Sequence, residues 1–253
     1  MESLKKLLQL EINLIRPALI AIAVWLALTI IVAITKYIGY ISGDYYLQTG
    51  NSRRKVRSDR GLSGEYFIYK RLKKLGGRFL FNLYLPKSDG TTTEIDAVML
   101  HESGIYVFES KNYSGWIFGG EWQQNWTQTF PSRREHFLNP IIQNKVHIKW
   151  LKAAFPGKSL PIHSFIVFGR DCKLKEIELT SGEHHVVTQK NLLLEVKKTL
   201  RRAEFLLDAD EIDEIYSALL NYSGVGRSVR KAHAKDVRRA RRRARSWFWR
   251  LFR

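Results

Sequence analysis

Residues 93–112 read TEIDAVMLHESGIYVFESKN, and this stretch predicts two neighbouring β-strands. Ala97 to Leu100 and Ile105 to Phe108 are continuous apolar runs, as expected of strands that are buried on both faces. The four residues between the runs, His101 to Gly104, suit a hairpin turn. A paired, buried hairpin is therefore expected at the centre of the domain.

Three charged residues lie at the ends of these strands: Asp96, Glu109 and Lys111. Because side chains alternate along a strand, Glu109 and Lys111 are expected to share one face, with Ser110 on the other. Two carboxylates and a lysine at a buried sheet edge are costly unless something uses them. A divalent metal with a phosphate would use all three, and a simple buried ion pair is the alternative.

The residue types and their spacing suit phosphodiester hydrolysis, which needs a metal, neutralisation of developing charge and an aligned substrate. Asp96 and Glu109 are hard oxygen ligands of the kind that Mg²⁺ (or Mn²⁺) accepts, and the backbone carbonyl of Ser110 would add a third oxygen. Lys111 would position water or stabilise negative charge. The pattern Asp-x12-Glu-x-Lys thus predicts a metal-dependent hydrolase site.

An amphipathic helix is predicted over residues 62–75, with Ser58 or Asp59 as its N-cap and Gly76-Gly77 as its end. Glu65 falls on the core-facing stripe of this helix, at helical spacing from its apolar residues. We expect Glu65 to orient a metal-bound water or the lysine. The alternative is a partly exposed glutamate near the helix start, where the helix dipole favours it.

The other predicted elements complete a compact α/β order of helix, three strands, helix and strand. A helix begins at Asn139-Pro140, a good N-cap followed by a good first-turn residue, and Gln143 and His147 share one of its faces. This helix is expected to run to about Ala154, with Ile142, Val146 and Trp150 at helical spacing. The remaining predicted strands are 79–85, 113–118 (with a break at Gly119-Gly120), 162–168 and 186–187. The remaining predicted helices are 192–202 and 209–222.

Three tryptophans, Trp116, Trp122 and Trp126, lie close together in the sequence. Exposed tryptophans would stack on nucleic-acid bases. Packing in the core of a hairpin is the expected role, since large aromatic side chains usually supply core area.

Four motifs in order resemble the NERD family, the nuclease-related domain: GLSGE (61–65), TEID (93–96), VFESKNYSG (107–115) and NPIIQN (139–144). The resemblance covers about Arg57 to Phe168. It implies the restriction-endonuclease-like fold of PD-(D/E)xK nucleases, an α/β mixed-sheet core flanked by helices. The site positions that it implies are Glu65, Asp96, Glu109 and Lys111, with Gln143 as a further site residue. Ser110 departs from the apolar residue that is usual between the acidic and basic positions.

The N-terminal region predicts a membrane anchor. Residues 18–35 carry no charge, and with residues 37–41 the apolar stretch is long enough to span a bilayer. We expect a retained single span over about 18–40. A cleaved signal peptide is the alternative, and the late start, the length and the lack of a small-x-small site oppose it. Basic residues are more numerous after the span, which predicts a cytoplasmic domain.

Charge is concentrated at the C-terminus of the 253-residue chain. The net charge is +18, and residues 227–253 account for +11 of it, with twelve Lys or Arg and one acid, Asp236. Such an excess favours nucleic acid or anionic lipid as a partner. The single cysteine, Cys172, excludes an internal disulfide and a cysteine-based zinc site, and a reducing compartment is expected.

The tail combines an arginine-rich helix candidate over residues 230–245 with the aromatic end SWFWRLF (246–252). This composition suits a membrane interface, and an arm that binds nucleic acid is the alternative. The chain is therefore divided into an N-terminal segment with the span (1–41), a basic juxtamembrane linker (42–57), the NERD-like core (58–168), a C-terminal extension (169–223) and the tail (224–253).

These features together predict a membrane-anchored, cytoplasmic, magnesium-dependent nuclease that acts on DNA or RNA. Two alternatives remain open. The first is a catalytically inactive nucleic-acid-binding module that has kept the fold. The second is a membrane-surface scaffold whose working parts are the span and the tail.

Overall fold

The structure is a computed structural model that describes residues 1–224, 226 and 228–239, with the side chains of all but residues 3–12 and 14. It forms two compact units, residues 1–47 and 48–253. The predicted α/β class, a mixed-sheet core flanked by helices, is confirmed. The helices are α1 (Glu2–Ile41), α2 (Asp44–Thr49), α3 (Arg53–Ser58), α4 (Arg60–Leu72), the 3₁₀ turn η1 (Lys73–Leu75), α5 (Pro140–Ala153), α6 (Leu192–Arg202) and α7 (Ala209–Leu220). The strands are β1 (Arg78–Pro86), β2 (Thr92–His101), β3 (Gly104–Lys111), β4 (Gly115–Gly120), β5 (Asn125–Phe130), β6 (Arg133–Leu138), β7 (Ile162–Phe168), β8 (Cys172–Glu178) and β9 (His184–Thr188).

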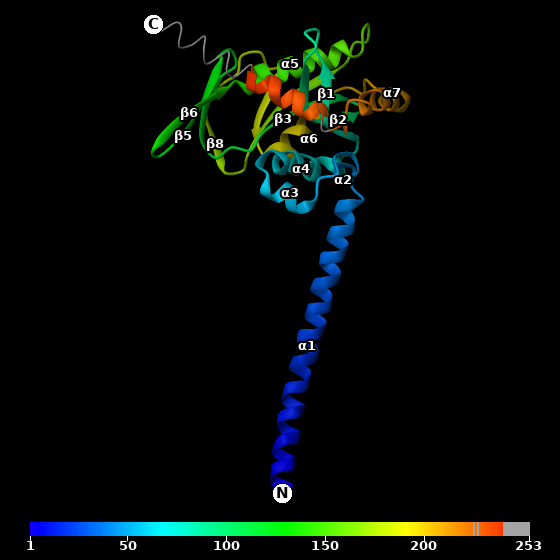
Figure 1. Cartoon of the computed structure of the whole chain (residues 1–253), viewed down its shortest axis with the longest axis vertical. Coiled ribbons are helices and arrows are strands. Elements are labelled where there is room, and N and C mark those ends of the chain that lie inside the picture. Colours follow the sequence, from blue (N-terminus) through cyan, green and yellow to red (C-terminus); the bar gives the residue numbers. More distant parts are fainter. Residues whose placement is uncertain (225, 227, 240–253) are drawn as a thin grey trace. The chain divides into compact units, whose positions relative to one another are not determined.

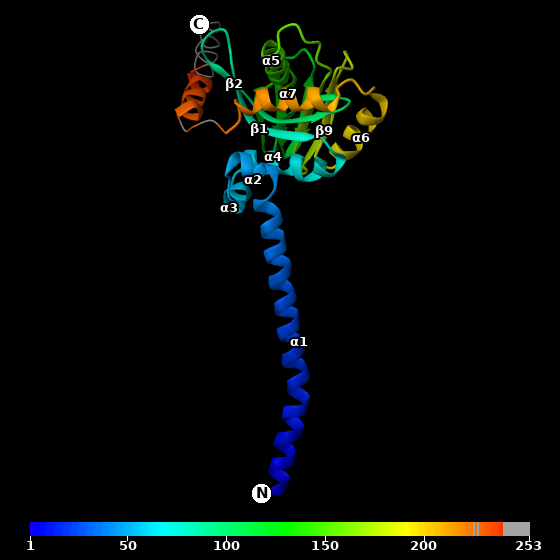
Figure 2. The same ribbon diagram turned by 90° about the vertical axis from the view of Figure 1, so that its right-hand side faces the viewer.

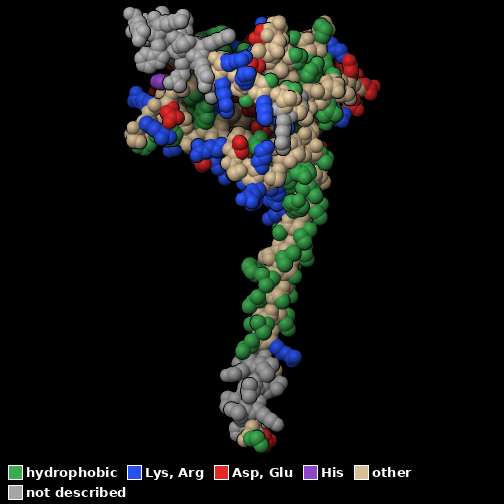
Figure 3. Space-filling view, viewed as in Figure 1, with side chains coloured by type: hydrophobic (Ala, Val, Ile, Leu, Met, Phe, Trp, Pro, Cys, Tyr) green, Lys and Arg blue, Asp and Glu red, His purple; other side chains and the backbone are tan. Residues whose placement is uncertain are grey.

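The first unit consists largely of α1, one continuous helix (Figure 1). Its portion Ile15–Ile41 is long and apolar enough to cross a membrane, and none of its most apolar window is buried inside the protein. Hydrophobic side chains cover this portion on the face shown in Figure 3. Its 27 residues extend roughly 40 Å at about 1.5 Å per residue, more than the hydrocarbon thickness of about 30 Å. The predicted span, 18–40, lies within it.

A five-stranded sheet in the order β1-β2-β3-β7-β9 forms the centre of the second unit. Strands β1, β2 and β3 pair antiparallel, whereas β3, β7 and β9 are parallel. His101 pairs with Gly104, so the predicted hairpin turn between β2 and β3 is confirmed. The carboxyl ends of the three parallel strands therefore meet at one edge of the sheet.

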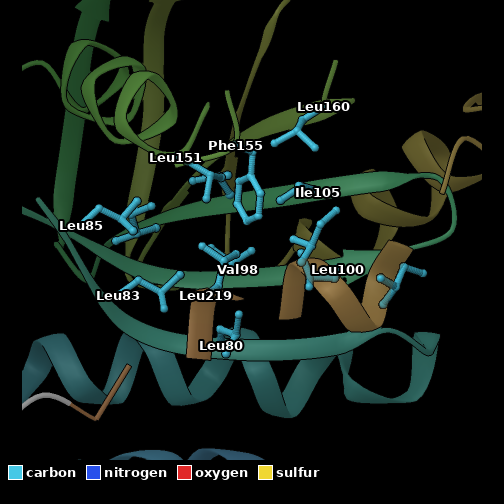
Figure 4. Packing of buried hydrophobic residues seen from close by; sticks show 14 of the residues in the cluster. Leu80, Leu83, Leu85, Val98, Leu100, Ile105, Leu151, Phe155, Leu160 and Leu219 are labelled. Carbon is cyan, nitrogen blue, oxygen red and sulfur yellow. The ribbon is translucent and has the colours of Figure 1, made fainter. Parts of the chain in front are cut away.

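Helices cover both faces of this sheet (Figure 2). Helices α5 and α7 pack on one face, where Leu151 and Phe155 join a cluster of strand residues (Figure 4). Helix α4 packs on the other, where Tyr69 meets Phe79 and Phe81 edge to face. The hairpin that carries Asp96, Glu109 and Lys111 is thus held between two apolar layers.

The predicted cap and stop residues of α4 are confirmed, but the helix runs from Arg60 to Leu72 and not over residues 62–75. The carboxylate of Asp59 accepts a hydrogen bond from Leu62 N at 3.1 Å, and η1 leads into Gly76 and Gly77, both with positive φ. Gly64 lets this helix approach β3 closely, because a Cβ atom there would lie only 2.2 Å from Ser110 Oγ. The glycine thereby sets the distance between α4 and the end of β3.

A second, four-stranded sheet in the order β6-β5-β4-β8 follows β3 along the chain. Gly119 and Gly120 belong to β4, which is irregular between Ile117 and Gly119, so the predicted break there is wrong. A Cβ atom at Gly119 would lie 2.3 Å from the ring of Trp126, so the absence of a side chain at this position makes room for the indole.

The expected core role of the three tryptophans is right for Trp126 and wrong for the other two. Trp126 is fully buried, whereas 48% of Trp116 and 72% of Trp122 is exposed. Each exposed ring lies under a lysine, with Lys175 Nζ 4.7 Å from the ring centroid of Trp116 and Lys145 Nζ 4.3 Å from that of Trp122.

The segment predicted as a linker, residues 42–57, is helical over most of its length, in α2 and α3. Ser52 caps α3 by accepting a hydrogen bond from Lys55 N at 3.3 Å. Asn51 and Val56 are buried, which explains why this polar and basic sequence is ordered.

Strand β1 is an edge strand, and three residues from two segments bond to its main chain. Tyr84 N donates to Tyr222 O at 3.0 Å. The carbonyl oxygens of Phe79 and Phe81 accept from Gln48 Nε2 at 2.6 Å and from Ser223 Oγ at 3.0 Å. The residues that precede α3 and follow α7 thus cover this edge.

The tail begins with a helix at residues 228–239, within which the predicted helix 230–245 starts. His233 Nδ1 lies 3.0 Å from Thr92 Oγ1, and the His233 ring packs edge to face against Tyr84. The first part of the tail therefore docks on β1 and β2. The predicted aromatic end, 246–252, lies outside the described residues.

Candidate active site

Glu109, Lys111 and Gln143 lie in direct contact. Lys111 Nζ donates to Glu109 Oε1 at 2.5 Å and to Gln143 Oε1 at 3.0 Å. Gln143 comes from the first turns of α5, which begins at Asn139-Pro140 as predicted. Glu109 and Lys111 share the α5 face of β3, and Ser110 points to Gly64 of α4, so the predicted alternation is confirmed.

His147, one turn beyond Gln143 on α5, holds the other oxygen of Glu109. Its Nε2 atom lies 3.1 Å from Glu109 Oε2, and its Nδ1 atom lies 2.6 Å from Thr93 Oγ1. His147 is 4% exposed and Glu109 is 1% exposed. The carboxylate of Glu109 is therefore fixed between a lysine and a histidine, and the histidine is oriented by a threonine of β2.

Asp96 is held beside Glu109 and Lys111 by a hydrogen bond from the backbone of Ser110, the residue between them. Ser110 N donates to Asp96 Oδ2 at 2.7 Å. The other oxygen of Asp96, Oδ1, has no hydrogen-bond partner among the residues that the structure describes. Burial raises the pKa of Asp96 well above its usual range, and the carboxylates of Glu109 and Glu65 raise it further. Three carboxylates thus converge on a space that contains one ammonium group.

Glu65 approaches Asp96 from α4. Its Oε2 atom accepts a hydrogen bond from Asn82 Nδ2 at 3.2 Å, and it is 6% exposed. Glu65 is buried and lies in the second turn of α4, so the alternative of a partly exposed glutamate at the helix start is wrong. Asn82 has φ of +50° on β1, between the residues that pair with Ala97 and Ile95, which aims its amide at Glu65.

Charge pairing keeps Glu109 ionised despite its burial. Burial acts to raise the pKa of Glu109, but Lys111 and His147 outweigh it and lower the pKa to about 2. Burial acts likewise to lower the pKa of Lys111, and Glu109 and Asp96 outweigh it, so its pKa is raised. The pair therefore consists of a deprotonated Glu109 beside a protonated Lys111.

The donor set at this site fits a hard divalent cation. Asp96 has a free oxygen, and each oxygen of Glu109 retains a lone pair beside the one that its donor uses. Within the described ranges no three His, Cys, Asp or Glu side chains form a metal-binding group. Magnesium is commonly held by only one or two carboxylates, together with water and substrate phosphates. Asp96, Glu109 and the carbonyl of Ser110 suit that pattern.

The structure brings all five predicted side chains to one place, and it adds His147, Thr93 and Asn82. The sequence showed His147 only as a residue that shares a helix face with Gln143. The i and i+4 spacing of Gln143 and His147 after the Asn139-Pro140 start was the available signal. Asn82 gave no signal, because its role depends on a left-handed backbone conformation in β1.

Comparison with known proteins gives two matches. The sequence profile of the nuclease-related domain (NERD) matches residues 60–169, which include all eight of these residues. An uncharacterized protein of Bacillus anthracis is 31% identical over 186 residues, which cover 72% of this chain and 86% of the relative. No solved structure matches the chain.

Proposed function

Because the chain belongs to the NERD family, we propose that it is a membrane-anchored, metal-dependent nuclease that hydrolyses phosphodiester bonds of DNA or RNA. The observation that carries the proposal is the contact of Lys111 with both Glu109 and Gln143, beside the partly free carboxylate of Asp96. This is an acid, acid and lysine arrangement at the end of a buried hairpin.

The residues have distinct roles in this proposal. Asp96 and Glu109 would hold Mg²⁺ or Mn²⁺ with the carbonyl of Ser110, and a bound metal would supply Lewis-acid charge. Gln143 and Glu109 hold the Lys111 ammonium in position, from which it stabilises negative charge on the phosphate. His147 fixes Glu109, and Glu65 orients water at Asp96.

The assay for this proposal is cleavage by the full-length chain in detergent. Single-stranded and duplex DNA and RNA, with free and blocked ends, are incubated with Mg²⁺, with Mn²⁺ or with EDTA. Metal-dependent cleavage that disappears in Asp96→Ala supports the proposal. Absence of cleavage of every substrate with either metal contradicts it.

A second candidate function is an inactive nucleic-acid-binding module. Both oxygens of Glu109 have protein partners, which is also what a purely structural ion pair would show. Binding of nucleic acid without cleavage, with equal affinity in wild type and Asp96→Ala, would identify this module.

The N-terminal helix supports membrane attachment, and the charge distribution supports a cytoplasmic domain. Cysteine labelling of intact cells tests the orientation, with single cysteines placed at exposed positions such as Glu176 or Lys197. Labelling by an impermeant reagent before lysis would show that the domain lies outside the cytoplasm and would contradict the predicted orientation.

The tail has two possible partners. The helix at 228–239 supports a nucleic-acid arm, because Arg230 lines a cavity of about 290 Å³ that Glu65 also lines. The aromatic end favours the inner leaflet by composition. A peptide of residues 227–253 should shift its tryptophan fluorescence to the blue on anionic vesicles if lipid is the partner. Tight binding to duplex DNA or RNA at moderate salt, without that shift, would identify the tail as a substrate arm.

A further inference from the structure

A cavity of about 560 Å³ lies at the carboxyl ends of β3, β7 and β9. Each of these parallel strands supplies one wall residue within two positions of its end: Asn112 after β3, Arg170 after β7 and Gln189 after β9. Crevices at the carboxyl ends of parallel strands are where open α/β sheets bind their ligands. The topology thus places this cavity where a ligand is expected.

Helix α4 forms the opposite wall with the side chains that face away from the core. Lys70 and Arg71 supply two charges, and the rings of Tyr66 and Phe67 supply flat apolar surface. Figure 3 shows Lys and Arg side chains gathered over α3 and α4. The wall therefore combines cations with aromatic rings, as nucleic-acid-binding surfaces do.

The charges of the cavity favour an anion. Lys70, Arg71 and Arg170 are exposed, and none of them forms an ion pair with a carboxylate in the part of the chain that the structure describes. Among the described residues that line the cavity, Asp171 is the one acidic residue. Three cations from two separate elements thus face one carboxylate, and a phosphate group would complement them.

The cavity shares a wall with the candidate active site. Gly169 N donates to Lys111 O at 2.9 Å, and Arg170 follows directly. A Cβ atom on Gly169 would lie 2.7 Å from Asn112 Oδ1, so glycine lets the two strand ends approach. Lys111 points to Gln143 of α5, whereas Asn112 Nδ2 donates to Arg60 O of α4 at 2.9 Å. The end of β3 is therefore a ridge between the active site and the cavity.

We propose that this cavity binds a phosphate of the nucleic-acid strand adjacent to the scissile phosphate, with Arg170, Lys70 and Arg71 as its ligands. The inference rests on the proposed nuclease function and identifies where the substrate continues beyond the site. Tyr66, Phe67 and the buried amide of Gln189 face the sugar and base of the same nucleotide. A strand that crosses the ridge then has one phosphate at Lys111 and its neighbour at Arg170.

Equilibrium binding tests the proposal independently of catalysis. A fluorescein-labelled single-stranded oligonucleotide is titrated with the full-length chain in detergent and EDTA, by anisotropy, at several salt concentrations. Arg170→Gln and Lys70→Gln should each bind severalfold more weakly. Each should also reduce the slope of log K against log salt by about 0.7, the value for one lost phosphate contact on a single strand.

Lys152→Gln is the matched control, since Lys152 is an exposed lysine in the last turn of α5. It should leave both affinity and slope unchanged. Equal losses in Lys152→Gln and Arg170→Gln would show that only overall charge matters and would overturn the proposal. So would a wild-type affinity and slope in Arg170→Gln.

Two further results separate this proposal from its premise and from a small-molecule site. If wild type binds the strand through Arg170 but never cleaves with Mg²⁺ or Mn²⁺, the cavity assignment stands and the nuclease proposal fails. If Arg170→Gln abolishes binding of AMP or inorganic phosphate but leaves oligonucleotide binding intact, the cavity holds a free small anion and the strand assignment is wrong.

Discussion

His147 Nε2 lies 3.1 Å from Glu109 Oε2, on the side of the carboxylate opposite Lys111. This buried histidine joins Thr93 on β2 to Glu109 on β3 and so couples α5 to the hairpin. The arrangement makes His147 a positioning residue, because it acts on the site through Glu109.

His147→Leu should lower kcat by about 10- to 100-fold, the range for loss of a partner that orients a metal ligand. KM for the nucleic acid should change little, since His147 is buried and does not face the substrate. Steady-state cleavage by His147→Leu and by His147→Gln checks this, because the amide of Gln can donate to Glu109 and should restore part of kcat. Equal losses of kcat in both variants would contradict a positioning role.

Lys111→Ala should lower cleavage by about 100- to 1,000-fold, as expected when one electrostatic stabiliser is lost. It should also destabilise the fold by about 3 kcal/mol, because it leaves the buried carboxylate of Glu109 without its lysine. In the double variant Lys111→Ala/Glu109→Gln the stability should return and the activity should not. Wild-type cleavage by Lys111→Ala would show that the lysine is structural.

Mg²⁺ or Mn²⁺ should bind at Asp96 and Glu109 and raise the melting temperature. The cation offsets the repulsion of Glu109 and Glu65 on Asp96, and a ligand that binds only the folded state stabilises it. Asp96→Asn should abolish both the calorimetric binding signal and the thermal shift. Glu176→Gln, which removes an exposed carboxylate elsewhere, serves as the control and should retain both. Metal binding that persists unchanged in Asp96→Asn places the ion elsewhere.

Gly64→Ala should destabilise the domain by about 1–3 kcal/mol, the usual effect of overpacking, because the new methyl group meets Ser110 Oγ at 2.2 Å. Ser110→Ala alone should be nearly neutral, since its buried hydroxyl has no partner among the described residues. In the double variant the two methyl groups lie about 3.5 Å apart, so most of the stability should return. Additive losses in a double-mutant cycle of urea unfolding would disprove the contact.

Glu121, which lies outside the candidate active site, should make the stability of the folded protein depend on pH. Its carboxylate is fully buried and accepts hydrogen bonds from Ser181 N at 2.9 Å, Thr180 N at 3.0 Å and Lys145 Nζ at 3.2 Å. The hydrogen bond from Ser181 is the largest cause that lowers its pKa below the ordinary value of 4.5. A lowered folded-state pKa contributes stability above the ordinary pKa and loses it as the pH falls further. Glu121→Gln should therefore melt lower than wild type at pH 7, with a difference that shrinks below pH 4.5, while Glu176→Gln shows no such trend.

Local signals were sufficient for the elements that build the centre of the domain. Alternation and apolar runs located β2 and β3, and caps located α4 and α5, because these features depend on neighbours in the sequence. The strands β5, β6 and β8 were not predicted. Strand β6 is largely exposed and polar, so its sequence has no apolar period, and it exists because β5 pairs with it.

The charged residues of the site and Gln143 were predicted as site residues, but His147, Thr93 and Asn82 were not. Helix α5 buries Asn144 and His147, whereas the apolar Val146 is 40% exposed, so a hydrophobic pattern indicates the wrong face. The buried amide of Asn144 is satisfied by Val107 O at 3.3 Å and Ser164 Oγ at 2.8 Å. Only the tertiary fold reveals these partners. Only the fold shows that Gly169, which directly precedes Arg170, bonds to the main chain of Lys111.

The hydrogen bonds that cover the edge of β1 determine which fragments of this protein will stay soluble. An uncovered edge strand is a template on which other chains add by strand pairing. Here Gln48, Tyr222 and Ser223 occupy main-chain groups of β1 that a second molecule would otherwise use. A fragment that begins after Gln48 or stops before Tyr222 would keep every residue of the candidate active site and still tend to aggregate. One that runs from residue 48 through the tail helix would keep that edge closed.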